Sequence, residues 1–167
     1  EAVQIVDLAR AHGTPLAAGL RRRADDSAAE ERHARALSEM ARELSGALTL
    51  EQVTEITRSF LHRLMKAKGD ILLYDRDGHA RPVNGTAEAP VLTIEPRLAT
   101  IAFETGQLVE CPQLGLNGYA VLYLPLQAPM RMRGVIAVAP EESTPDALHT
   151  QRTRLETMAS LVAIAIE

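Results

Sequence analysis

The chain has 167 residues, of which 46% are apolar and 24% charged, as in a globular domain rather than a disordered segment. Its 18 basic and 22 acidic residues give a net charge of −4, so we expect no nucleic-acid partner. The single cysteine excludes an internal disulfide and a thiolate cage for a metal. The length predicts one domain with an appendage. Because the chain begins at Glu1 and not at Met, we expect it to be a piece of a longer protein.

The first third of the chain has a helical pattern but few core residues. Val3 to Leu8 suggests a short helix, which Gly13 and Pro15 should end because both residues oppose continuation. Residues 16–33 alternate charged side chains with alanines, which is compatible with a helix but leaves too little apolar surface to pack in a core. We therefore predict a helical linker over residues 1–33 and a folded domain over residues 34–167.

Two amphipathic helices are predicted next. Apolar residues recur at spacings of three and four from Ala36 to Leu48, which places them in one stripe on a helix. Thr49 with Gln52 has the spacing of a capping box and should begin a second helix. We expect that helix to stop at Gly69.

The rest of the chain alternates short strands, turns and helices. Asp77-Gly78 is a strong hairpin signal, and Thr144-Pro145-Asp146 is a typical helix start. The predicted elements are strands at 71–74, 79–83, 108–111, 119–126 and 134–139, a short helix at 96–105 ending at Gly106, and a long terminal helix. This order predicts an α+β fold, with a mostly antiparallel sheet and helices collected on one face.

Several segments carry a family resemblance. Arg35–Glu51 resembles the N-terminal signalling helix of the GAF domain in KdpD-type sensor histidine kinases. Ala102–Gln107 resembles that family's short central helix, and Tyr123–Leu126 with Arg133–Val138 resembles its last hairpin. Arg152 to Thr157 is similar to its C-terminal signalling helix. The resemblance covers roughly residues 16–167.

The resemblance implies a non-catalytic signalling and dimerisation domain, with a GAF-like sheet and long N- and C-terminal helices. The parent would be a two-component kinase of the inner or plasma membrane that responds to potassium or osmotic stress and acts on a response regulator. The domain itself would lie in the cytoplasm, with Arg21–Arg23 just inside the membrane. The alternative is a GAF domain that binds a small molecule in a soluble regulator.

By analogy with GAF domains, the ligand pocket would lie between the sheet and nearby loops. Alternation places Tyr119, Val121 and Tyr123 on one face of their strand. The pocket candidates are Phe103, Cys111, Tyr119, Val121 and Tyr123. A face of this kind also serves simply as core. Cys111 has the features of a small buried apolar residue more than those of a nucleophile or a bilin attachment point.

The helical stripes give a second set of candidates. A homodimer through the N- and C-terminal helices would use Leu37, Met40, Leu44, Leu48, Leu155, Met158, Val162 and Ile166. The same side chains could instead cover the domain's own sheet, and the sequence leaves both possibilities open.

No catalytic residue, metal site or cofactor is predicted. The five histidines are scattered, and no two share metal-ligand spacing on one element. His149 lacks the acidic neighbour of a phosphoacceptor histidine and is interpreted as a surface residue. Asp75 and Asp77 do not have the spacing of a calcium loop and are interpreted as part of the hairpin turn.

Overall fold

The computed structural model describes the backbone of residues 3–83, 92–111, 120–140 and 145–167. Side chains are described for residues 17–83, 92–111, 120–140 and 151–167. The chain divides into two compact units, Glu1–Ser38 and Glu39–Glu167.

Helix α1 runs without interruption over Val3–Ser45, and the side chains of residues 17–32 are almost all exposed. The predicted break between His12 and Pro15 is therefore wrong. A proline costs an interior helix about 3 kcal/mol, but the alanine-, leucine- and arginine-rich sequence after it has high helix propensity over many residues. Among the described residues, none of the helices combines the length and apolarity that a membrane span requires.

Helix α2 spans Leu50–Met65 and begins with the predicted capping box: Gln52 N–H donates to the Thr49 hydroxyl, and the Gln52 side chain accepts from Thr49 N–H. Its predicted end at Gly69 is wrong. The helix ends at Lys66, which takes the left-handed conformation, and Gly69 lies inside the next strand. A side chain at Gly69 would collide with Leu61 of α2, so the glycine permits close helix–sheet packing.

The sheet has five strands in the order β2-β1-β5-β4-β3, and every neighbouring pair is antiparallel. The strands are β1 Ala67–Tyr74, β2 Ala80–Pro82, β3 Val109–Cys111, β4 Val121–Gln127 and β5 Met132–Pro140. The predicted α+β class and both predicted hairpins are confirmed, although β1 begins four residues earlier than expected.

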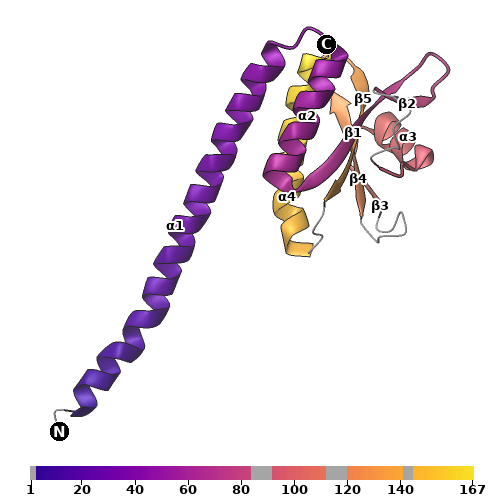
Figure 1. The fold of residues 1–167 in the computed structure, drawn as a ribbon. Coiled ribbons are helices and arrows are strands. Elements are labelled where there is room, and N and C mark those ends of the chain that lie inside the picture. The colour runs from indigo at the N-terminus through magenta and orange to yellow at the C-terminus, as the bar shows by residue number, and fades with distance from the viewer. Residues whose placement is uncertain (1–2, 84–91, 112–119, 141–144) are drawn as a thin grey trace. The chain divides into compact units, whose positions relative to one another are not determined.

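Helices cover both faces of this sheet (Figure 1). The long helices α2 and α4 (Pro145–Ala165) lie on one face, as predicted, where they bury Ile71, Leu124 and Ile136. The short helix α3 (Pro96–Thr105), which ends at Gly106 as predicted, covers the opposite face and packs on Leu72, Tyr123 and Val135. The expectation that the helices collect on one face is therefore wrong for α3, because successive residues of β4 and β5 are buried and both faces of these strands need cover. The sheet therefore separates a long-helix side from an α3 side.

Candidate functional site

Four of the five pocket candidates meet on the α3 side of the sheet. Val121 and Tyr123 of β4 belong to the buried cluster there, and Phe103 and Cys111 are partly buried against it. The fifth candidate, Tyr119, lies outside the described residues. Cys111 pairs with Val121 at the end of β3.

Tyr123 fixes the start of α3. Its ring is fully buried, and its hydroxyl accepts a hydrogen bond of 2.8 Å from the backbone N–H of Glu95, the N-cap residue of α3. Burial is the main reason that the pKa of Tyr123 is raised, and the hydroxyl therefore stays protonated at neutral pH. This hydrogen bond gives Tyr123 a structural role in joining β4 to α3.

Tyr74 also belongs to this side but was missed in the sequence. Its ring stacks on that of Phe103, with centroids 4.0 Å apart and an interplanar angle of 21°. The missed signal is alternation along β1, which places Tyr74 on the same face as buried Leu72. Within the described part of the chain, the buried Tyr74 hydroxyl makes no hydrogen bond of normal geometry, although the Thr100 side chain is near. Burial is the main cause that raises the pKa of Tyr74, and the interaction with Thr100 acts in the opposite direction.

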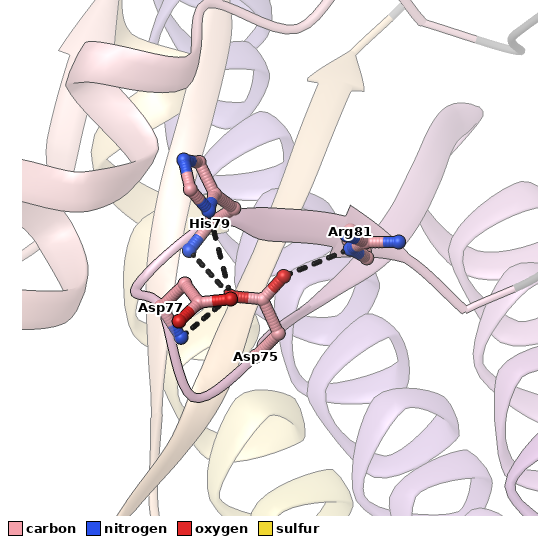
Figure 2. A network of polar contacts seen from close by, with 4 residues as sticks. All are labelled: Asp75, Asp77, His79 and Arg81. Carbon is pink, nitrogen blue, oxygen red and sulfur yellow. Dashed lines mark hydrogen bonds and ion pairs between the residues drawn. The ribbon is translucent and has the colours of Figure 1, made fainter.

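The β1–β2 turn is a polar network centred on Asp75 (Figure 2). The Asp75 carboxylate accepts from the backbone N–H groups of Asp77 and His79, at 3.0 and 2.9 Å, and from Arg81 Nε at 2.9 Å. Asp75, Asp77 and His79 place possible metal ligands within 4.8 Å of one another. Because three donors already occupy the Asp75 carboxylate, this geometry fits the predicted hairpin turn.

Two surface cavities are lined by residues other than the four described pocket candidates, and one of them borders Gly106 and Leu108 at the end of α3. One, of about 180 Å³, has Leu124 and Ala159 among its lining residues together with the half-exposed Arg152–Glu156 ion pair of α4. The other, of about 420 Å³, is lined by the end of α1 and the start of α2, including Ala47 and Ile56. The sequence analysis predicted neither cavity. The first combines residues that are far apart in the sequence, and the second forms where the chain bends between α1 and α2.

Most of the predicted dimer residues are inside the domain. Met40, Leu44, Leu155, Met158 and Val162 are buried, Leu37 and Ile166 are half-buried, and Leu48 is 91% exposed. The structure therefore assigns five of the eight to the domain's own core. Of this set, Leu48 is the residue that presents most of its side chain to solvent.

The five-stranded antiparallel sheet between two long helices and one short helix defines the class of this protein. The sequence profile of the GAF domain family matches residues 49–167, and the chain belongs to that family. GAF domains are regulatory domains of signalling proteins, so regulation rather than catalysis is the role of this region.

Solved GAF domains share the fold at low sequence identity. The native GAF domain of the potassium sensor histidine kinase KdpD from Escherichia coli is 24% identical, with a TM-score of 0.64 over 80% of this chain and 92% of that one. The nlh2 GAF domain of A. aeolicus, in an inactive state, is 15% identical, with a TM-score of 0.60 over 82% and 96% of the two chains. The GAF domain of an Acinetobacter phosphoenolpyruvate-protein phosphotransferase is 16% identical, with a TM-score of 0.58 over 79% and 90%. No curated protein sequence matches the chain.

Proposed function

We propose that this GAF domain is the signal-relay and dimerisation domain of a KdpD-like sensor histidine kinase. The observation that carries the proposal is the pair of long helices at its ends: α1 has 43 residues and α4 has 21. Both helices contribute to the domain core, through Met40 and Leu44 of α1 and Leu155 of α4, so each is mechanically joined to the domain. The KdpD GAF domain shares this fold, as do GAF domains of other signalling proteins, and the resemblance of Arg35–Glu51 to the KdpD-type signalling helix is what favours this parent.

In such a parent, the domain would lie on the cytoplasmic side of the inner membrane and respond to potassium or osmotic stress. The kinase part would autophosphorylate a histidine with ATP and transfer the phosphoryl group to a response regulator. The GAF domain contributes the mechanical step, which is a change in how the helices of two copies pack.

The exposed apolar residues near the helix ends are the best dimer contacts. Leu48 follows α1 and is 91% exposed, and Ile164 in the last turn of α4 is 57% exposed. Two copies that pair through these helices would remove both side chains from water, which is favourable at roughly 25 cal/mol per Å² of apolar surface. We therefore expect a homodimer that depends on Leu48 and Ile164.

Sedimentation velocity of the 167-residue chain tests this expectation over a wide concentration range. The double variant L48E/I164E should shift the dimer to monomer, because it places like charges at the contact. Met130 in the β4–β5 turn is 85% exposed and provides the matched control, so M130E should leave the dimer intact. A wild-type chain that stays monomeric at the highest concentration contradicts the dimer.

A second candidate function is the binding of a small molecule on the α3 side, as in a GAF domain of a soluble regulator. The observation that favours it is the buried Tyr74 hydroxyl, which has no partner of normal geometry within the described residues and lies beside Phe103. A buried hydroxyl whose Thr100 neighbour is poorly placed for a hydrogen bond is costly, and a ligand could supply a better partner.

Thermal unfolding followed by circular dichroism tests this second function with potassium, sodium, ATP and cyclic mono- and dinucleotides. A ligand present at one hundred times its dissociation constant should add about 2.7 kcal/mol to the unfolding free energy. The shift should shrink in Y74F, which removes only the hydroxyl. No shift with any compound would count against binding and favour the relay.

A further inference from the structure

The first residues of β5 connect the two sides of the sheet. The Met132 side chain reaches the end of α3, where its Cε lies 3.4 Å from the position that a Cβ on Gly106 would occupy. Val135, three residues later, is fully buried in the α3-side cluster with Tyr123. Any displacement of α3 therefore acts on the strand at both of these positions.

Arg133 lies between these two contacts and pairs with the other helix. Its Nη2 atom is 3.2 Å from the Glu167 side-chain carboxylate and donates to the Glu167 backbone carbonyl at 3.4 Å. Glu167 lies two residues after α4, so this contact joins β5 to the C-terminal part of that helix. Arg133 thus links β5 to a residue 34 positions away in the sequence.

The environment of this pair is asymmetric. The Arg133 side chain is only 10% exposed, whereas that of Glu167 is 35% exposed. The Arg133 Nε atom is buried and has no hydrogen-bond partner within the described residues. The carboxylate can therefore leave for water, while the guanidinium stays in place with an incomplete set of acceptors.

We propose that Arg133 is a positioning residue that couples α3 to the C-terminal end of α4. Movement of α3 shifts the start of β5, and this shift strengthens or releases the Arg133–Glu167 contact. The end of α4 is then held against the sheet or freed from it. The proposal rests on the relay function for its biological purpose, but the coupling is a property of the single chain.

Hydrogen exchange tests the contact itself. The amides of Ile166 and Glu167 donate to the carbonyls of Val162 and Ile164, and they report on the last turn of α4. R133M keeps the aliphatic stem and removes the donors, so these two amides should exchange about tenfold faster. E167Q should have a similar effect, and the double variant should add little to either one.

The matched control is Arg152, which pairs with Glu156 on the same helix at 3.0 Å and is half-exposed. R152M should leave the two reporter amides unchanged. The comparison is repeated with a short Gly-Ser extension after Glu167, so that the terminal carboxylate cannot replace the Glu167 side chain. Unchanged exchange in R133M, or a uniform increase that also includes α2, would overturn the proposal, since the second result indicates a merely structural role.

The coupling to α3 has a separate readout. F103L removes the stack on Tyr74 and should change exchange of the reporter amides in the wild-type background but not in R133M. Equal effects in both backgrounds would show that Arg133 does not transmit the change. Hydrogen exchange is measured on dilute monomer, so the coupling can be tested even if sedimentation shows that the chain does not dimerise. A negative exchange result likewise leaves the dimer proposal intact.

Discussion

Lys66 holds an unusual backbone conformation at the junction of α2 and β1. Its φ of 48° and ψ of 47° place it in the left-handed region, and its N–H donates to the Leu61 carbonyl to close the helix. Because β1 begins at Ala67, a single residue makes the whole reversal from helix to strand. A residue with a Cβ is strained in this conformation by about 1–2 kcal/mol, whereas glycine is not.

We therefore expect K66G to stabilise the domain by about 0.5–1 kcal/mol. The strain energy that glycine removes exceeds the entropic cost of a more flexible unfolded chain. Urea unfolding measures the change. K68G, two residues later in β1, should instead destabilise the domain, because glycine weakens a strand with ordinary dihedral angles. A K66G variant that is less stable than wild type would contradict the strain argument.

Asp75 provides a pH-dependent contribution at the β1–β2 turn. Hydrogen bonds, first of all from His79 N–H, lower its pKa below the ordinary value of 3.8. A carboxyl whose pKa is lower in the folded state stabilises the fold above pH 3.8, and the contribution disappears as pH falls through the folded-state pKa. D75N should therefore be less stable than wild type at pH 7, and the difference should narrow below pH 3.8.

Urea unfolding across this pH range measures the difference. D77N is the matched control, because Asp77 contributes its backbone N–H rather than its carboxylate to the network. Its stability relative to wild type should change little with pH. A D75N deficit of the same size at pH 7 and at acidic pH would exclude the carboxylate as its source.

At the scale of elements, α2 is attached to β1 by a largely buried ion pair. Arg58 of α2 donates from Nε and Nη2 to one carboxylate oxygen of Asp70, at 3.2 and 2.5 Å, and Asp70 is only 5% exposed. Removal of the arginine would leave a buried charge unpaired, which is more costly than the net value of the pair.

We expect R58M to lower the unfolding free energy by about 2–3 kcal/mol, less than for a fully buried pair because Arg58 is partly exposed. Adding D70N removes the unpaired charge, so the double variant should be more stable than the sum of the single effects predicts. Urea unfolding of the four proteins gives this coupling. If the two single effects on the unfolding free energy simply add, the interaction between Arg58 and Asp70 contributes nothing to stability.

The same elements show what the sequence predicts well. Local signals such as the Thr49–Gln52 capping box, the Asp77-Gly78 turn and Gly106 each act within four residues, and all three are confirmed. The end of α2 was missed, because the helix ends at a lysine in the left-handed conformation, where the sequence pattern favours the glycine three residues later. The Tyr74–Phe103 stack depends on contacts across 29 positions, which no local pattern encodes.

At the scale of the whole molecule, the buried core belongs to the second unit. Every core residue that the structure describes lies at Met40 or later, although α1 continues from the first unit into the second. The last two turns of α1 are thus part of the folded domain, while the described side chains before them are mostly exposed. This distribution predicts where the chain can be shortened.

A chain that begins at Glu39 should keep a melting temperature within about 3 °C of the full chain. A chain that begins at Gly46 loses Met40 and Leu44 and should melt more than about 10 °C lower, because two buried side chains are removed. Circular dichroism measures both transitions. Equal melting of the two shortened chains would show that the end of α1 does not stabilise the domain.

The outer strands of the sheet have a consequence for copies held close together. In the described part of the chain, the edge strands β2 and β3 have three residues each. Strand β2 carries the exposed Arg81 and ends at Pro82, which has no N–H to donate. Strand β3 carries the exposed Glu110. Short, charged edges are poor templates for the backbone of another chain. Neighbouring copies can therefore be crowded together at high local concentration without stacking edge to edge into fibrils.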